Sequence, residues 1–151
     1  YCLPVRGHPG EGGIMSEYKK PLPRPAVESK PFWDGCRKHQ LLLPHCLRCG
    51  SYWFPASVTC PECLSLEWEW IPSRGMGKIH SFGVYHRVYQ KGFEPQIPYA
   101  VALVQLDEGP RLISNVEGCA VEELRCDIPV EVFFEDVTDD TTLYKFRLRK
   151  P

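Results

Sequence analysis

Four cysteines arranged as two Cys-x-x-Cys pairs are the residues of this chain whose types and spacing point most directly to chemistry. They follow the pattern C-x2-C-x10-C-x2-C and are Cys46, Cys49, Cys60 and Cys63. Each pair turns the backbone so that two thiolates point at one centre, and two facing pairs complete a tetrahedron around zinc. Four sulfur ligands leave no open position for water or substrate, so we predict a structural zinc site that contributes on the order of 10 kcal/mol to folding.

Other uses of four thiols suit this sequence less well. A redox pair normally opens a helix in a thioredoxin-like βαβ pattern, and that pattern is absent here. Iron in a rubredoxin-like site would use the same four sulfurs, so the spacing alone does not separate iron from zinc. Of the four other cysteines, Cys2 lies in residues 1–14, which are left out of the fold argument. The other three stand alone and are interpreted as small buried hydrophobic residues, with a nucleophilic Cys119 as the minor alternative; they are Cys36, Cys119 and Cys126.

Composition excludes several classes of function. The 151 residues include 18 basic and 19 acidic side chains, and this balance argues against broad non-specific binding of nucleic acid. The sequence contains no run of 18 or more apolar residues, the length needed to span a membrane. Its first residues lack the apolar region of a signal peptide. We therefore expect a cytoplasmic protein whose cysteines are thiols or metal ligands rather than disulfides.

The segments before the cysteines predict an arm and a helix. Residues 1–27 form the arm, whose proline-rich and basic part, 16–27, is interpreted either as an extension that lies on a partner or as a disordered tail. Met15 fits a native start, so residues 1–14 are taken as a non-native remnant or an upstream extension. Residues 28–44 then predict a short helix, with Ser29 as its cap and an apolar stripe; the stripe comprises Phe32, Trp33, Cys36 and Gln40.

The metal-binding segment itself covers residues 45–72 and is rich in large aromatic side chains, which we expect to cover the small module and join it to its neighbour. From Gly75 the pattern changes to short strands, so residues 73–151 form a second domain. The predicted strands span residues 76–89, 99–106, 111–116, 129–137 and 142–150. Five short strands with a small helical piece between the third and the fourth favour a closed barrel of the OB type in a mainly β protein.

Alternation within these strands assigns faces to their side chains. His80 and His86 fall among apolar positions and are interpreted as packing residues. In the last strand, Lys145, Arg147 and Arg149 fall on one side and are interpreted as a solvated basic stripe. The odd positions of the first strand and the loop after it supply a surface of aromatic and basic side chains: Tyr85, Arg87, Tyr89, Lys91 and Phe93.

Taken together, the chain resembles a family of acyl-CoA-associated OB-fold proteins with an N-terminal rubredoxin-like zinc ribbon, catalogued as a domain of unknown function. The resemblance covers about residues 28–149 in the family's order. It rests on PFWDG, LLLPHCLRCGSYWFPASVTCPEC, SRGMGKIHSFGVYHR, PYAVALVQLDEGPRLISNV and PVEVFFED. One departure is RCDIPV, where Cys126 and Asp127 stand near the place of a glycine that is usual in the family.

This resemblance implies a non-catalytic subunit that binds part of a coenzyme A (CoA) thioester beside a thiolase, or beside a related aldolase or hydratase, in the breakdown of fatty, steroid or aromatic acids. Aromatic and basic side chains suit adenine and phosphate, so the surface from Tyr85 to Phe93 is the candidate CoA site, with an ordinary solvated face as its alternative. The expected assembly is a heteromer with structural zinc, required by the enzyme but not catalytic alone.

Two other functions stay open at this point. A single-stranded nucleic-acid-binding module is the first alternative, because zinc ribbons and OB barrels both occur in such proteins. A stand-alone hydrolase that uses Cys119 or His86 is the second. Against catalysis, the sequence has no G-x-S-x-G elbow, no phosphate-binding G-x-x-x-x-G-K loop and no paired carboxylates in an apolar setting.

Overall fold

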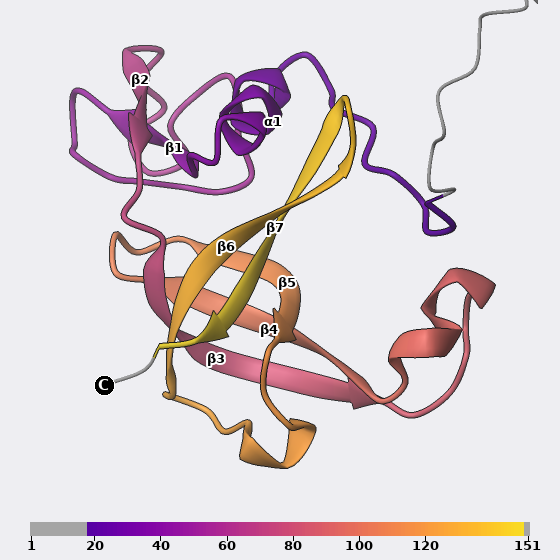
Figure 1. Cartoon of the computed structure of the whole chain (residues 1–151). Helices are drawn as coiled ribbons and strands as arrows, with labels where there is room; N and C mark the ends of the chain where they lie inside the picture. The colour runs from indigo at the N-terminus through magenta and orange to yellow at the C-terminus, as the bar shows by residue number, and fades with distance from the viewer. Residues whose placement is uncertain (1–17, 150–151) are drawn as a thin grey trace, which may run out of the picture.

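Residues 18–149 are described by a computed structural model, in which a small ribbon and one helix sit at one end of a barrel (Figure 1). The first seventeen residues of the predicted arm, and Met15 with them, lie outside the described residues. Within 18–149, no helix has the length and apolar character needed to cross a membrane. The elements are α1 (Lys30–Arg37), β1 (Leu42–Cys46), β2 (Trp68–Pro72), β3 (Met76–Tyr85), η1 (Lys91–Gln96), β4 (Tyr99–Leu106), β5 (Arg111–Glu117), η2 (Val121–Glu123), β6 (Pro129–Thr138) and β7 (Thr141–Leu148).

The ribbon is an antiparallel pair, β1 and β2, in which Leu42 lies opposite Pro72 and Cys46 opposite Trp68. The long connection between the two strands carries the cysteine pairs. Gly50 ends the first turn with a φ of 75°, in the left-handed region that glycine adopts without steric cost. Its backbone N–H donates to the carbonyl of Cys46 at 2.9 Å, which closes the turn around the first two cysteines.

The barrel is closed in the strand order β3-β4-β5-β7-β6, which confirms the predicted five-stranded OB fold. Its core is built by alternation, as in β4, where every second residue from Ala100 to Leu106 is buried. All neighbouring strands are antiparallel except β5 and β7, which are parallel and pair only at Val116↔Phe146 and Glu117↔Arg147. The β6–β7 hairpin extends beyond the barrel and reaches α1 (Figure 1).

Aromatic packing joins the ribbon and helix to the barrel, as the sequence predicted. Phe32 of α1 is buried in the same core as Phe146 of β7, and its ring meets Tyr144 edge-on at 5.3 Å and Phe54 at 5.0 Å. The chain enters the barrel at Gly75, whose φ is 67°. A Cβ atom on Gly75 would lie 2.1 Å from the side chain of Val132, so a larger residue has no room here.

Several predictions about single side chains are wrong. Ser29 is the N-cap residue of α1 as predicted, but its hydroxyl bonds to Ala26 instead of a helix N–H, and Gln40 is exposed beyond the helix end. The first barrel strand ends at Tyr85, and the bulge between Ile79 and Ser81 shifts the alternation. As a result, His80 points to solvent, and His86, which follows the strand, is exposed as well.

The isolated cysteines and the basic stripe also differ from expectation. Cys36 is buried as predicted, whereas Cys119 is half-buried and Cys126 is exposed in the loop before β6. Lys145 is not part of a solvated stripe: only 4% of its side chain is exposed, because two glutamates on neighbouring strands pair with it. Near the departure from the family pattern, Asp127 has a φ of 64°, a backbone conformation for which glycine is the usual residue.

Candidate functional site

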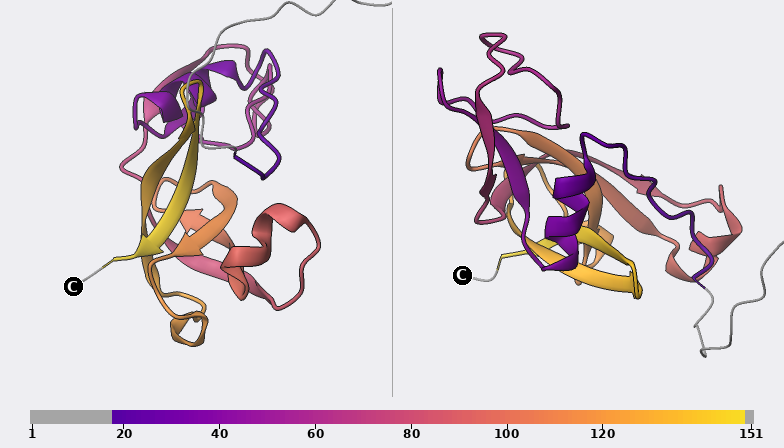
Figure 2. Two further views of the ribbon diagram at one scale, coloured as in Figure 1. Left: turned by 45° about the vertical axis from the view of Figure 1, so that its right-hand side comes forward. Right: turned by 90° about the horizontal axis from the view of Figure 1, so that it is seen from above.

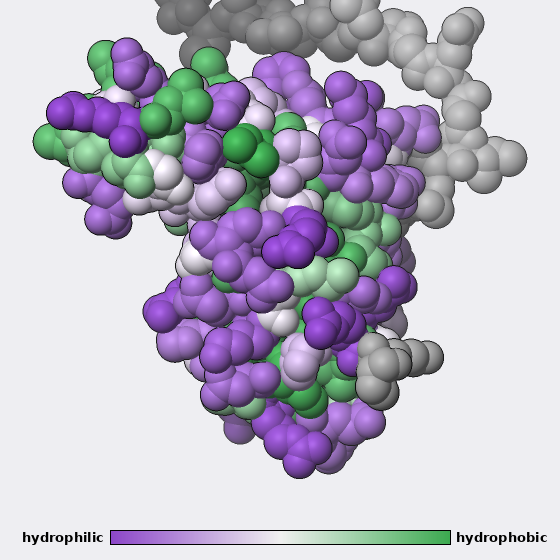
Figure 3. Space-filling model, turned by 90° about the vertical axis from the view of Figure 1, so that its left-hand side faces the viewer, coloured by the Kyte–Doolittle hydropathy of each residue, from purple (hydrophilic) through white to green (hydrophobic). Residues whose placement is uncertain are grey.

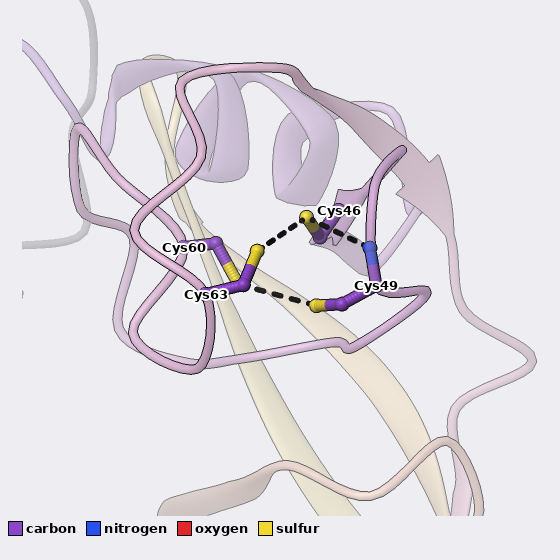
Figure 4. A group of neighbouring side chains, drawn as sticks. All are labelled: Cys46, Cys49, Cys60 and Cys63. Carbon is purple, nitrogen blue, oxygen red and sulfur yellow. Dashed lines mark hydrogen bonds between the residues drawn. The ribbon is translucent and has the colours of Figure 1, made fainter.

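The four predicted metal ligands converge on one point at the end of β1 (Figure 4). All four Sγ atoms lie within 4.8 Å of one another, and the pairs Cys46–Cys63 and Cys49–Cys60 are each separated by 3.6 Å. A tetrahedral site with zinc–sulfur bonds of about 2.3 Å needs sulfur separations of about 3.8 Å. The thiol positions therefore fit zinc, and zinc bound there would hold the two cysteine turns together.

Neighbouring groups shift the pKa values of two of these thiols in opposite directions. Hydrogen bonds with Ser51, first with its hydroxyl at 3.3 Å and then with its backbone, lower the pKa of the Cys49 thiol to about 6. Against a backbone hydrogen bond from Ser65, burial and the neighbouring thiols raise the pKa of Cys63 to about 12. A lowered pKa favours the thiolate, which is the form that binds zinc. Trp53 and Trp68 pack beside the buried Cys46 and Cys60, so the site forms a small core of its own.

A second group of side chains gathers where β3 ends, η1 turns and β4 begins. Tyr85 stacks on Tyr99 with ring centroids 5.1 Å apart and planes within 4°, and Phe93 lies against the same Tyr99 at 5.1 Å. Tyr89 meets Tyr85 edge-on at 6.0 Å. We call Tyr85, Tyr89, Phe93 and Tyr99 the aromatic cluster. Three of its members were predicted from the sequence; Tyr99 was missed because it belongs to a strand whose apolar pattern suggested burial on both faces.

Two basic residues, Arg87 and Lys91, alternate along the sequence with members of the aromatic cluster. Arg87 and Lys91 are exposed and form no ion pair within residues 18–149. Lys20 of the arm places its ammonium group 4.7 Å from the centroid of the Phe93 ring and donates a hydrogen bond to Gln96. The described part of the arm therefore lies on its own barrel, between α1 and η1 (Figure 2).

Lys145 forms a compact charge cluster next to this arm. Its ammonium group donates to Glu117 at 2.7 Å and also pairs with Glu135. Burial favours the neutral amine, but the two carboxylates outweigh it, so the pKa of Lys145 rises above its ordinary value. Since both carboxylates already hold the ammonium group, Lys145 is not free to bind a phosphate.

Comparison with known proteins places both parts of the chain in one family. A family model described as the rubredoxin-like zinc ribbon domain of ChsH2 matches residues 33–69, and a model described as the C-terminal OB-fold domain of ChsH2 matches residues 70–135. The chain belongs to the ChsH2 (DUF35) family. This membership confirms the resemblance on which the sequence-based expectation rested.

Some relatives of this ChsH2-family chain carry names from CoA chemistry, and others are named as scaffold proteins, such as a DUF35 domain-containing scaffold protein of Methanocaldococcus jannaschii that is 33% identical over 76% of this chain and 86% of its own. It is 32% identical to the benzoylsuccinyl-CoA thiolase subunit BbsA of Thauera aromatica, with 83% of each chain covered. It is 33% identical to a probable enoyl-CoA hydratase alpha subunit of Thermomonospora curvata over 85% of its own length, but it spans only 40% of that protein. A solved structure titled Ltp2-ChsH2(DUF35) aldolase superposes with a TM-score of 0.77 at 28% identity, covering 83% of this chain and 98% of that one.

Proposed function

We propose that this chain is a non-catalytic subunit that holds the CoA part of an acyl-CoA thioester for a separate catalytic subunit of the thiolase type, or of a related aldolase or hydratase. The observation that carries the proposal is the aromatic cluster at the end of β3 and the start of β4 of the OB barrel, with the ammonium group of Lys20 over Phe93 and with Arg87 and Lys91 in the same segment. Relatives named as subunits of enzymes with CoA substrates support the same proposal. Zinc has a structural role in it.

The aromatic cluster has the features that adenine and phosphate binding requires. The ring of Tyr85 stacks on Tyr99 and is exposed at the surface, and an aromatic base can stack on the face of such a ring. The guanidinium of Arg87 and the ammonium of Lys91 are available for the phosphate groups of CoA. The loop that carries them joins the first two strands of the barrel, one of the two loops that bind ligands in other OB folds.

The zinc ribbon supplies a surface for the catalytic partner in this proposal. Four apolar side chains around the cysteine turns are more than half exposed: Leu47, Val58, Leu64 and Leu66. Figure 3 shows hydrophobic residues among polar ones on the projecting ribbon end, at the upper left. Exposed apolar groups that gather on one projecting module are typical of an interface with another protein.

The test of CoA binding uses the full chain and calorimetric titration with acetyl-CoA. We expect Tyr85→Ala to weaken binding about tenfold, equivalent to about 1.4 kcal/mol, because one stacking surface is lost. Phe133→Ala is the matched control, since Phe133 is a partly exposed aromatic residue on β6, outside the aromatic cluster. Absence of acetyl-CoA binding, or salt-dependent binding of single-stranded DNA in its place, would refute the proposal.

The test of the partner uses co-expression of this chain with a thiolase-type catalytic subunit from the same organism. We expect a stable complex whose activity on a CoA ester requires both chains, while this chain alone turns over none. Leu47→Glu with Leu66→Glu should abolish co-purification, because charged groups replace apolar ones at the ribbon surface. Turnover of a CoA ester by the isolated chain would show that it is an enzyme and contradict the proposal.

A further inference from the structure

The barrel is split on one side, between β5 and β7. These strands pair only at their far ends, through Val116↔Phe146 and Glu117↔Arg147. Before these pairs the two strands diverge, and a hollow of about 270 Å³ opens between them. It is lined by Val101, Ile113, Ser114, Asn115, Leu143, Tyr144 and Lys145.

Backbone polar groups face into this split. The carbonyl of Ile113 accepts a hydrogen bond from the hydroxyl of Tyr144 at 3.1 Å, and the carbonyl of Tyr144 accepts one from Ser114 at 2.7 Å. Side chains therefore bridge the gap that a strand-to-strand ladder would otherwise fill. Because the N–H and C=O of one residue point to the same side of a strand, the N–H of Ile113 faces the split as well.

The remaining lining combines apolar walls with neutral polar groups. Val101, Ile113 and Leu143 are apolar, and 64% of Ile113 is exposed. Asn115 donates from its side-chain nitrogen to the carbonyl of Ala100, and its side-chain oxygen has no hydrogen-bond donor within residues 18–149. The one cation, Lys145, is neutralised by Glu117 and Glu135. The hollow thus suits a neutral chain with amide groups rather than an anion.

The hollow continues the aromatic cluster along the same face of the barrel. Val101 follows Tyr99 by two residues on β4, so both side chains point outward from the same face, about 7 Å apart along the strand. Val101 lies opposite Asn115 on β5, which leads across to the split. A ligand bound at the aromatic cluster can therefore extend over β4 and β5 into the hollow.

We infer that the split between β5 and β7 binds the pantetheine arm of CoA, an extended chain with two secondary amides and apolar groups between them. This inference rests on the proposed function, because it extends a ligand whose adenine end lies at the aromatic cluster. The amides bond to the side-chain oxygen of Asn115 and to the backbone of β5, in the manner of a peptide added to a strand edge. The apolar part of the arm packs on Val101, Ile113 and Leu143.

The experiment separates the two halves of the ligand. The full chain is titrated with coenzyme A, with D-pantetheine and with adenosine 3′,5′-bisphosphate, which lacks the pantetheine arm. Ile113→Glu should weaken the binding of coenzyme A and of pantetheine about tenfold, because it places a solvated charge in the hollow. The affinity for the bisphosphate should change by no more than about twofold. Val27→Glu, which introduces the same charge at an exposed apolar residue before α1, should affect none of the three.

A second measurement locates pantetheine directly. Its addition should shift the backbone amide resonances of residues 113–115 and 143–145 and leave those of the ribbon unchanged. Coenzyme A that binds the Ile113→Glu variant as tightly as the original chain would overturn the inference and leave the proposed function intact. Failure of coenzyme A to bind the original chain would overturn both. Shifts produced by an extended peptide but not by pantetheine would assign the hollow to a polypeptide instead.

Discussion

At the scale of single residues, Leu64 and Gly50 occupy equivalent positions in the ribbon. Each lies four residues after the first cysteine of its pair, and each donates its N–H to that cysteine's carbonyl at 2.9 Å. Gly50 adopts its φ of 75° without cost, whereas Leu64 holds a φ of 60° with a side chain that is 74% exposed. A leucine that is both strained and exposed does not stabilise the fold. Its presence is consistent with a place on the proposed partner surface.

Leu64→Gly should therefore stabilise the zinc-loaded chain by about 0.5–1 kcal/mol, because glycine takes the left-handed conformation without a clash of its Cβ atom. Chemical denaturation at saturating zinc measures the difference. Gly50→Leu is the matched control and should destabilise the chain by about 1 kcal/mol. A less stable Leu64→Gly variant would show that the leucine side chain contributes to the fold.

Lys145 gives a second prediction for a single residue. Lys145→Met should destabilise the barrel by about 2 kcal/mol, because Glu117 and Glu135 lose their partner. The loss is smaller than for a fully buried ion pair, because water partly solvates both carboxylates. Adding Glu117→Gln and Glu135→Gln should restore most of the loss. A raised pKa means that the stabilisation is complete below the ordinary value of 10.5 and is lost as the pH rises through the higher, folded value. The difference in the free energy of unfolding between the original chain and Lys145→Met should thus stay constant between pH 7 and 9, and should narrow only above about pH 10.5.

At the scale of elements, the segment after α1 is held to the β6–β7 hairpin by one polar contact group. The ring of His39 stacks on Phe134 at 5.4 Å, and its Nε2 lies 3.0 Å from a carboxylate oxygen of Asp136. The same oxygen accepts a hydrogen bond from the hydroxyl of Thr142 at 2.6 Å. This group connects residues 97 positions apart, so it couples the helix and ribbon to the barrel.

The contribution of this contact group to the free energy of unfolding depends on pH, because Asp136 can be protonated. Hydrogen bonds from Thr142 and then His39 hold the pKa of Asp136 below its ordinary value of 3.8. The stabilisation is complete above that ordinary value and is lost as the pH falls through the lowered one. Thr142→Val removes the first of these bonds, so the variant should unfold at a higher pH than the original chain in an acid titration followed by circular dichroism. Coincident acid transitions for the two proteins would contradict this role.

At the scale of the whole molecule, the chain has one main core and one small core. The main core contains the barrel residues together with Phe32 of the helix and Leu43 of the ribbon. The small core consists of Cys46, Trp53 and Cys60, with Cys63 and Trp68 against it, and so contains three of the four predicted metal ligands; Cys49 is exposed. The barrel is therefore supported by its own packing, whereas we expect the ribbon end, whose core has only a few side chains, to depend on a bound metal.

Removal of the metal should unfold the ribbon end and leave the barrel folded. With a strong chelator, the backbone amides of residues 46–68 should lose protection from hydrogen exchange, while those of β4 and β6 keep it. Cys60→Ser should have the same effect without chelator. Metal analysis should find one zinc per chain; a chain without metal whose four thiols are oxidised to disulfides would refute the assignment.

Much of this architecture was predictable from local patterns. The spacing of the four cysteines predicted the metal ligands, and alternation predicted five barrel strands, because ligand spacing and strand periodicity are properties of short segments. The aromatic positions Tyr85, Tyr89 and Phe93 were identified in the same way. The wrong predictions have local causes too: a bulge at Ile79 displaced the alternation of β3, and the ending of that strand at Tyr85 left His86 exposed.

The sequence by itself determined which four cysteines come together, the mainly β class and the family of this protein. Only the tertiary structure decided which side chains meet across strands. It buried Lys145 between Glu117 and Glu135, stacked Tyr99 on Tyr85, and opened the split between β5 and β7. These results depend on strand neighbours and register, which bring together residues far apart in the chain, and no short-range pattern encodes them.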